Sequence, residues 1–546
     1  MNYEQEIKKF FKGEISSDEK TLAAASHDAS IFEVKPSLVV APLDVYDIKN
    51  LVSYAIKKKQ AREEISLTAR SAGTDMSGGP LSESIILNFL PHFNRIKEVG
   101  TGYAIAEPGV YYRDFERETL KKGVLMPSYP ASRDLCTVGG MVANNAGGEK
   151  TLTYGKTENY VRQVKMVLAD GGEYTFQPLT VPELEKESSQ PGFFGEVCRK
   201  MFELVTKNYD LLKKSKPNVS KNSSGYFLWN IYDKEKGLFD LTKLITGSQG
   251  TLGIITEVKL LLVHPKPCTS LLITFLPTLK PLAEVTNRIL KFSPESFESF
   301  DDHTLKFAVK LFPSIVKKLN GNLMKLAFQF LPEFWMVLTG GVPKLILIAE
   351  FTADTAEAAA AKAAAAKEYH IPFHLKTKIA KNEAEVKKYW TFRRESFNLL
   401  RQHMKNLRTA PFIDDFVVRP EFLPEFLPKL NVILSKYQIT YTVAGHVGDG
   451  NFHIIPLMDL KKPESVEIIK ELSGKVYRLV LDFKGSISGE HNDGLIRSSY
   501  LPMMYEPEII KLFEETKKIF DPLNIFNPGK KVGADRRYAW EHINRA

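Results

Sequence analysis

Three glycine clusters in the first half of the chain constrain the fold more than any other feature of this sequence. They contain Gly73, Gly78 and Gly79, then Gly139, Gly140, Gly147 and Gly148, and finally Gly247, Gly250 and Gly253. Glycines gather where a backbone must turn tightly or approach another group closely. Because a predicted helix (44–59) and a predicted strand (65–70) lie among further short strand-like segments, residues 36–265 are expected to form a mixed α/β region whose loops meet a ligand.

The first cluster, Arg70-Ser-Ala-Gly-Thr-Asp-Met-Ser-Gly-Gly79, directly follows the predicted strand. Consecutive backbone N–H groups in such a loop can form an anion-binding nest, with the hydroxyls of Ser71, Thr74 and Ser77 nearby. The loop lacks both the Gly-Lys-Ser/Thr ending of a P-loop and the Gly-x-Gly-x-x-Gly of a Rossmann turn. Alone it is equally compatible with a surface turn, but three such clusters favour an extended ligand that carries phosphates and a flat ring.

Two prolines, Pro265 and Pro267, separate this region from a second α+β unit. Strands and helices alternate there, at 269–276, 344–351, 353–368 and in a long helix through Trp390. The last stretch, with a predicted helix at 508–520 and an Asn-Pro-Gly-Lys turn, is too short for a domain and is expected to pack back on the first region. We therefore expect three parts, residues 1–266, 267–491 and 492–546.

An apolar, helical insert is predicted within the second unit, over residues 303–341. From residue 306 onward half of its residues are Phe, Trp, Ile, Leu, Val or Met, with five lysines and only one acid, Glu333. Such a stretch fits a buried helical layer, and it also fits a face that docks on a membrane surface or a partner.

The motif His446-Val-Gly-Asp-Gly-Asn-Phe-His453 lies between two apolar strands. If Asp449-Gly450 forms a two-residue hairpin turn, residues 446 and 453 pair directly, with Cβ atoms about 4.5–5.5 Å apart. Two imidazoles at that distance can share one divalent metal, although histidines beside a glycine turn also fit a structural role. Ser488-Gly-Glu-His-Asn-Asp-Gly494, at the end of another predicted strand, adds Glu490 and His491. A His/His/Glu set with an open position is typical of catalytic zinc or manganese sites.

Charge and cysteine content exclude several other classes. Lys and Arg exceed Asp and Glu by 74 − 65 = +9, but the charges are interspersed, so no nucleic-acid partner is expected. Cys136, Cys198 and Cys268 stand too far apart to hold zinc or an iron–sulfur cluster. No run of about 18 uncharged apolar residues predicts a membrane span. The polar start, which lacks the apolar stretch of a signal peptide, predicts a cytoplasmic protein.

In their order and spacing, the three glycine clusters resemble the FAD-binding domain of the vanillyl-alcohol-oxidase or PCMH-type flavoprotein superfamily. The later motifs resemble its branch of FAD-linked 2-hydroxy-acid dehydrogenases, which includes D-lactate dehydrogenase, the glycolate oxidase catalytic subunit and D-2-hydroxyglutarate dehydrogenase. The resemblance implies an α+β fold with a PCMH-type FAD-binding domain of two subdomains over 1–266. It also implies an α+β substrate or cap domain with a largely antiparallel sheet over 267–491, and a return of 492–546 to the FAD domain.

The resemblance places the FAD pyrophosphate on the loop at 70–79 and the flavin ring between the second glycine cluster and the cap domain. Because that loop has no histidine for a covalent tether, FAD is expected to be noncovalent. The residues that the resemblance implies for FAD binding are Arg70, Ser71, Ala72, Gly73, Thr74, Asp75, Ser77, Gly78, Thr137, Gly139, Gly140, Asn144, Ala146, Gly147, Gly253, Ile255 and Asn527.

The same resemblance implies that His446, His453 and Glu490 ligate the metal and that His491 is the catalytic base. Adjacent Glu490 and His491 are expected to diverge, so that one binds metal while the other faces the substrate. Arg393, in Trp390-Thr-Phe-Arg393-Arg394, matches an arginine that grips the substrate carboxylate. From the residues alone, Arg393 is equally well a solvated helix arginine, Arg394 could be the true match, and Arg497 is a second candidate. At Asn492-Asp493 this sequence departs from the Gly-Ile of many family members. The shape of the site on its substrate side is therefore the part that the resemblance does not give.

The implied reaction is oxidation of a D-2-hydroxy acid of the lactate, glycolate or 2-hydroxyglutarate class. Electrons would pass from FAD to an external acceptor: a quinone, a cytochrome or a separate iron–sulfur subunit. Two alternatives stay open, an oxygen-using FAD alcohol or sugar oxidase and a noncatalytic flavin-binding subunit that transfers electrons. The segment 306–341 adds the alternative of a peripheral location on the inner face of the membrane.

Overall fold

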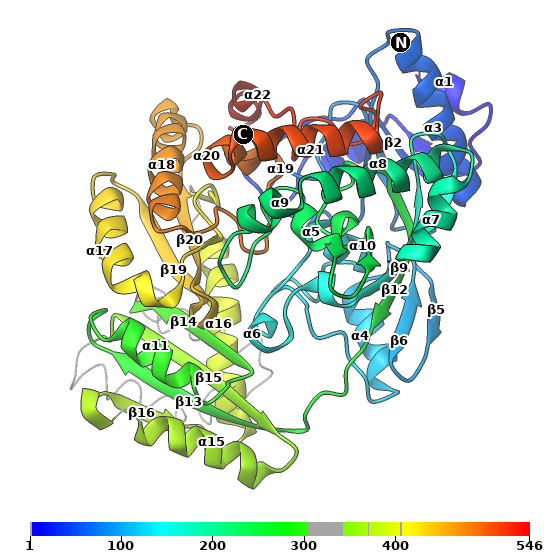
Figure 1. The fold of residues 1–546 in the computed structure, drawn as a ribbon. Coiled ribbons are helices and arrows are strands. Elements are labelled where there is room, and N and C mark those ends of the chain that lie inside the picture. The colour runs from blue at the N-terminus through cyan, green and yellow to red at the C-terminus, as the bar shows by residue number, and fades with distance from the viewer. Residues whose placement is uncertain (1–2, 303–341, 370, 404–406, 546) are drawn as a thin grey trace.

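The computed structural model describes residues 3–302, 342–369, 371–403 and 407–545 (Figure 1). The predicted apolar insert at 303–341 lies outside these ranges. Within them, no helix is both long and apolar enough to cross a lipid bilayer.

The N-terminal part begins with a four-stranded sheet in the order β1-β2-β4-β3, in which β4 pairs in parallel with β2 and β3. Its strands are β1 (Glu14–Ser16), β2 (Leu38–Ala41), β3 (Leu67–Arg70) and β4 (Ile85–Asn88). Helix α3 (Val45–Gln60) starts where the Asp44 side chain accepts from the N–H groups of Tyr46 and Asp47. The predicted helix and strand are thus confirmed, and β3 leads directly into the first glycine cluster.

A second, antiparallel sheet of the N-terminal part has the order β5-β6-β12-β7-β8. Its strands are β5 (Ile96–Val99), β6 (Tyr103–Ala106), β7 (Val161–Val167), β8 (Glu173–Phe176) and β12 (Ile254–Leu261). A small third sheet contains β9 (Leu179–Thr180), β10 (Tyr232–Asp233) and β11 (Leu238–Phe239). The central strand β12 follows the third glycine cluster, so two of the three clusters lie next to strand ends.

Short helices surround these sheets (Figure 1). They are α1 (Tyr3–Ile7), α2 (Glu19–Ala25), α4 (Tyr112–Leu120), α5 (Val138–Asn144), α6 (Thr151–Tyr154), α7 (Val181–Ser189), α8 (Phe193–Lys207), α9 (Tyr209–Ser215) and α10 (Thr242–Ile245). Helix α5 contains the start of the second glycine cluster, so this cluster begins in a helix where the other two begin in loops.

The cap part is built on one antiparallel sheet in the order β16-β13-β15-β14-β19-β20-β17, with β18 also paired to β20. Its strands are β13 (Cys268–Leu276), β14 (Ser296–Asp301), β15 (Leu345–Ala353), β16 (Lys376–Ile379), β17 (Arg408–Thr409), β18 (Phe416–Val417), β19 (Thr440–His446) and β20 (Asn451–Met458). Its helices are α11 (Leu282–Leu290), α15 (Ala356–Glu368), α16 (Glu383–His403), α17 (Leu423–Leu434) and α18 (Pro463–Asp482). The expected antiparallel sheet is confirmed.

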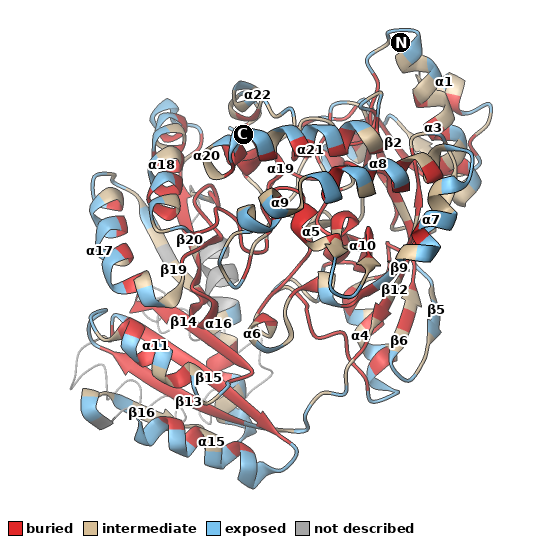
Figure 2. Ribbon diagram, in the orientation of Figure 1, coloured by how far each residue is buried: buried red, intermediate tan, exposed pale blue. Residues whose placement is uncertain are grey.

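Both faces of the central cap strands are buried, which Figure 2 shows in red. On one face Leu272 and Leu347 belong to a core that includes residues of α11, α15, α17 and α18. On the other face Leu271 and Ile346 pack with Tyr389 and Trp390 of α16. Burial on both faces explains why these strands read as continuous apolar runs.

The C-terminal stretch contacts the N-terminal part and also contributes Leu495, Ile496, Ala539 and Ile543 to the core of the cap part. It holds α19 (Gly494–Arg497), α20 (Leu501–Met504), α21 (Pro507–Phe520) and α22 (Arg536–Glu541). Helix α21 contacts α8, and Phe526 forms a parallel bridge with Leu67 of β3. The Asn527 side chain donates to the carbonyl oxygens of Gly79 and Gln249, at 2.9 and 2.7 Å. This one residue therefore joins the first glycine cluster to the third.

Candidate active site

The hairpin that carries His446 and His453 differs from its prediction. Residues 447–449 form a 3₁₀ turn and Gly450 has φ +66°, so four residues connect the strands where two were expected. His446 therefore pairs with Asn451 and His453 pairs with Ala444, and the predicted direct pairing of the histidines is wrong. Because the register is shifted by an even number of residues, both side chains stay on one face of the sheet. Their ring centroids lie 5.2 Å apart.

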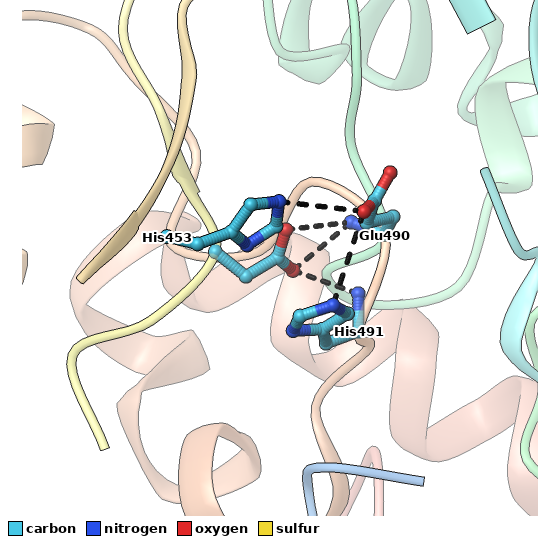
Figure 3. Close-up of side chains that lie close together, drawn as sticks. His453, Glu490 and His491 are labelled. Atoms are coloured by element: carbon cyan, nitrogen blue, oxygen red, sulfur yellow. Dashed lines mark hydrogen bonds and ion pairs between the residues drawn. The ribbon is translucent and has the colours of Figure 1, made fainter. Parts of the chain in front are cut away.

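Three imidazoles converge on one carboxylate oxygen, and Figure 3 shows two of them beside Glu490. Oε1 of Glu490 lies 3.1 Å from Nε2 of His446, 3.5 Å from Nε2 of His453 and 3.8 Å from Nε2 of His491. The side-chain exposure of these histidines is 5%, 11% and 21% in the same order. The structure therefore brings the four residues of the two histidine motifs together and leaves His491 the most accessible.

The segment that carries Glu490 and His491 is a loop and not the end of a strand. The Asp415 carboxylate accepts from the backbone N–H groups of Glu490 and His491, and also from Ser488 Oγ and Asn451 Nδ2. Glu490 Oε1 and His491 Nε2 lie 3.8 Å apart, so the two side chains converge and the predicted divergence is wrong. Asp415 offers a ligand atom within 4.8 Å of those of His453, Glu490 and His491, a group that does not include His446. Its oxygens already accept from four donors, so we assign it to holding the loop.

A second carboxylate lies behind each histidine of the cluster. Nδ1 of His446 is 2.5 Å from Glu298 Oε1, while Asp414 reaches Nδ1 of both His453 and His491, at 3.0 and 2.6 Å. Burial lowers the pKa of His446 and of His491, but the neighbouring carboxylates outweigh burial and raise each pKa to about 9. These acids, which sequence reasoning missed, favour positive charge at this place, as a divalent cation would supply.

Lys221 is a further member of the cluster that no motif indicated. Its side chain is fully buried, and its Nζ lies 3.1 Å from Oε2 of Glu490, 3.5 Å from Asp449 Oδ2 and 3.3 Å from the Gly148 oxygen. Burial opposes its charge, but the Glu490 and Asp449 carboxylates raise the pKa of Lys221 above its ordinary value. The two carboxylate oxygens of Glu490 thus have different partners: Oε2 contacts Lys221, and Oε1 faces the histidines.

The three candidate arginines have different surroundings. Arg393 of α16 forms an ion pair with Glu298 at 3.0 Å, which links it to His446. Arg394 forms an ion pair with Glu149 at 2.5 Å and lies over the Trp390 ring. Arg497 is fully buried and donates to the backbone oxygens of Asp414 and Asn492. Arg393 is therefore next to the cluster, while Arg497 supports its backbone.

The glycine clusters meet around Asp75 and Gln249. Asp75 accepts from the N–H groups of Ser77 and Gly79 and from Asn144 Nδ2 of the second cluster. Gln249 Nε2 donates to Ser77 Oγ at 3.1 Å and to Asn144 Oδ1 at 3.3 Å. Ser71 and Thr137 hydroxyls are also bonded to each other, at 2.5 Å. Hydrogen bonds thus join residues of all three clusters, which are distant in sequence.

Some of the residues predicted to bind FAD are also required by the packing of the protein itself. A Cβ atom at Gly78, Gly139 or Gly253 would lie 2.8 Å from the Phe32 ring, 2.4 Å from Pro108 or 2.8 Å from the Val167 oxygen, respectively. Ile255 belongs to β12 and pairs with Met166. At Gly147 a Cβ would lie 3.3 Å from Glu490 Oε2, so the second cluster passes directly beside the histidine cluster.

The loop at 70–79 fits a bound phosphate. Gly73 has φ +65°, and a Cβ there would lie 2.3 Å from the Arg70 guanidinium. Nη1 of Arg70 is buried and has no hydrogen-bond partner among the residues described. A buried guanidinium N–H without an acceptor is what a phosphate oxygen would satisfy. These observations suit the pyrophosphate of FAD.

The histidine cluster fits a divalent metal. Donor atoms that share one ion at about 2.1 Å lie about 3–3.5 Å apart. The distances from Glu490 Oε1 to His446 Nε2 and His453 Nε2 are 3.1 and 3.5 Å. Nitrogen and carboxylate donors of this kind suit zinc or manganese.

Two family models match this chain. The family model "FAD binding domain" matches residues 36–176, and the model "FAD linked oxidases, C-terminal domain" matches residues 268–531. The D-2-hydroxyglutarate dehydrogenase of Pseudomonas putida is 28% identical over 528 residues, which are 95% of this chain and 50% of that protein. The D-lactate dehydrogenase of Archaeoglobus fulgidus is 27% identical over 91% of both chains. The chain thus spans about half the length of the first of these relatives.

Among solved structures, p-cresol methylhydroxylase with bound substrate superposes with a TM-score of 0.66 at 15% identity, over 95% of this chain and 93% of that one. At this identity the likeness concerns the fold alone. The chain thus has the fold of p-cresol methylhydroxylase, and the two family models identify it as an FAD-binding protein. Its two matching domains are those of FAD-linked oxidases, and over most of its length the chain is similar to D-2-hydroxyglutarate and D-lactate dehydrogenases.

Proposed function

We propose that this protein oxidises a D-2-hydroxy acid of the lactate, glycolate or 2-hydroxyglutarate class to the 2-oxo acid. The proposal includes noncovalent FAD on the three glycine clusters and a divalent metal, zinc or manganese, on His446, His453 and Glu490. The observation that carries it is the convergence of three histidines on Glu490 directly beside the second glycine cluster. The names of the two relatives support this substrate class.

Each protein residue has a defined task in this reaction. Arg393, held by Glu298, binds the substrate carboxylate with its planar guanidinium. His491, the most exposed histidine of the cluster, takes the C2 hydroxyl proton on Nε2, while Asp414 behind Nδ1 stabilises the resulting positive charge. A metal ion held by His446, His453 and Glu490 would supply Lewis acidity toward the substrate hydroxyl. FAD, when bound, would supply the acceptor for the hydride from C2.

The reduced flavin requires an external electron acceptor, which we propose to be a quinone, a cytochrome or a separate iron–sulfur subunit. The segment 306–341, with half apolar content and five lysines against one acid, is the proposed contact with an anionic membrane surface. Sedimentation with anionic vesicles at low and high salt tests this contact. The control protein has Lys310, Lys317, Lys318 and Lys325 replaced by Gln. Binding that is lost with these charges supports the contact, and absence of binding in both proteins rejects it.

Anaerobic titration of the purified protein with paired D- and L-2-hydroxy acids tests the proposed reaction. We expect the flavin absorbance to bleach with at least one D acid and not with its L enantiomer. Acid or heat should release free FAD from the denatured chain. Rapid oxygen consumption with simple alcohols or sugars would favour the oxidase alternative instead. A flavin that no 2-hydroxy acid reduces would favour the noncatalytic electron-transfer subunit.

A further inference from the structure

Asp414 is a buried carboxylate that contacts Nδ1 of two histidines of the cluster. Its Oδ1 lies 3.0 Å from Nδ1 of His453 and its Oδ2 lies 2.6 Å from Nδ1 of His491. The residue is fully buried between β17 and β18, and Arg497 donates to its backbone oxygen at 2.6 Å. Neither carboxylate oxygen therefore faces solvent. The histidines hold the carboxylate, and Arg497 holds the backbone of the same residue.

This arrangement has a direct consequence for where the imidazole protons lie. An ionised carboxylate only accepts hydrogen bonds, so both Nδ1 atoms must carry a hydrogen. A divalent cation held by this cluster would disfavour a further positive charge, so that each ring is neutral and its Nε2 lone pair is free. The two Nε2 atoms lie 3.5 and 3.8 Å from Oε1 of Glu490. The two rings are nearly parallel, with centroids 5.0 Å apart and an interplanar angle of 24°. A shared acceptor explains both the common tautomer and the common orientation.

We propose that Asp414 is a positioning residue that sets the tautomer of His453 and of His491 at the same time. It thereby positions the metal ligand and the proton acceptor together, because each ring would lose its hydrogen bond to this carboxylate if its hydrogen moved to Nε2. His446 is outside this unit, since its Nδ1 lies against Glu298. The roles named for His453 and His491 rest on the proposed function, but the tautomers follow from the contacts alone.

The variant Asp414→Asn tests the proposal because it keeps the shape of the side chain and removes one acceptor. The amide oxygen can accept from one ring, while the amide NH₂ donates to Nδ1 of the other ring. The second ring must then carry its hydrogen on Nε2, where it blocks the lone pair that faces Glu490. One of the two histidines is therefore expected to change its tautomer, and both cannot keep the original one.

The direct measurement is ¹⁵N-edited proton NMR of the FAD-loaded protein, labelled only at histidine. Resonances are assigned with His453→Asn and His491→Asn variants. The wild-type protein should show a downfield Nδ1–H proton for both histidines, with or without Zn²⁺, and Asp414→Asn should lose one of them. If either ring of the wild-type protein is a neutral Nε2–H tautomer, the wild-type spectrum alone overturns the proposal. Two unchanged Nδ1–H protons in Asp414→Asn would overturn it as well.

Zn²⁺ binding and turnover give an independent second readout. If His453 changes tautomer, affinity for Zn²⁺ should fall about 10–100-fold. If His491 changes instead, affinity should stay and turnover should fall about 10²–10⁴-fold. Unchanged affinity together with unchanged turnover contradicts the proposal. A wild-type protein that binds neither Zn²⁺ nor Mn²⁺, or whose flavin no 2-hydroxy acid reduces, contradicts the proposed function, while the NMR result still decides the tautomers.

Asp47→Asn is the matched control for the loss of a buried carboxylate. Asp47 is 1% exposed and accepts from the N–H groups of Lys12, Gly13 and Leu43, in the N-terminal part. This variant should leave the histidine resonances, the affinity for Zn²⁺ and the turnover at wild-type values. Equal changes in Asp47→Asn and Asp414→Asn would reduce Asp414 to a general structural role.

Discussion

The glycine clusters and the histidine cluster are both polar sites, but they are built in different ways. The first cluster is made by short-range contacts, such as the Asp75 carboxylate that accepts from Ser77 and Gly79. The histidine cluster is made by long side chains from distant segments, in which Lys221, Glu298 and Asp414 each orient another residue. A site of the first kind depends on backbone shape, while a site of the second kind depends on buried pairs of opposite charge.

The largest effect is expected from replacing Glu490, the carboxylate on which the histidines converge, because this change should affect only one of the two sites. Glu490→Ala removes the oxygen that His446 and His453 face, so the metal should be lost and turnover with it. FAD should stay bound, because the glycine clusters are unchanged. Metal analysis and flavin absorbance of the purified variant measure the two outcomes separately. Loss of FAD together with the metal would show that the two sites are one unit.

Gly73→Val is the reverse experiment. Its Cβ would collide with the Arg70 guanidinium, and the residue has φ +65°, so the variant should be depleted of FAD and still bind metal. Gly123→Val is the control, since Gly123 has φ +68° but nothing within 4 Å of its Cβ position. If both variants keep FAD equally, the first glycine cluster does not hold the phosphate.

A smaller effect is expected for the histidine that is most exposed. His491→Ala should keep the metal and lower turnover about 10²–10⁴-fold, the usual cost of losing a general base. His453→Ala, in the same cluster, should lose the metal. Metal content and single-turnover flavin reduction distinguish the two variants, and equal metal loss in both would mean that His491 is a ligand.

Lys221 tests whether buried charge pairs support the second site. Lys221→Met removes the partner of Glu490 Oε2, and metal affinity is expected to fall about 10–100-fold while FAD content is unchanged. Lys531→Met is a matched control, because Lys531 is also fully buried but bonds to Ser223, Gly225 and Asp493. Similar metal affinity in both variants would mean that Lys221 only supports the fold.

The difference between the two sites also explains what could be predicted from the sequence. The glycine clusters, the helix capped by Asp44 and the four residues of the histidine motifs were visible because each lies in one continuous stretch. The hairpin register was wrong because Val447–Asp449 form a 3₁₀ turn before Gly450. Lys221, Glu298 and Asp414 were missed because only the folded chain brings them to the histidines, and a lone Lys, Glu or Asp carries no motif.

The smallest expected effect concerns a third polar cluster, where the two parts of the molecule meet. Lys150 and Arg394 form ion pairs there with Glu295 and Glu149, and Glu350 of β15 is buried beside them. Burial raises the pKa of Glu350 from 4.5 to about 7, with the charges of Glu295 and Glu149 acting in the same direction and Lys150 opposing them. A carboxyl group with a raised pKa binds its proton more tightly in the folded state, so its contribution to stability declines between pH 4.5 and pH 7.

Glu350→Gln removes this titration while keeping the shape of the side chain. The variant should melt at a higher temperature than the wild type at about pH 8, by at most the equivalent of about 3 kcal/mol. The difference should shrink toward zero near pH 4.5, where the wild-type carboxyl group is protonated in the folded state. Melting curves of both proteins across this range measure it, with turnover as a check on the neighbouring site. A pH-independent difference would mean that Glu350 is already ionised and paired, and the contact between the two parts would then resemble the histidine cluster.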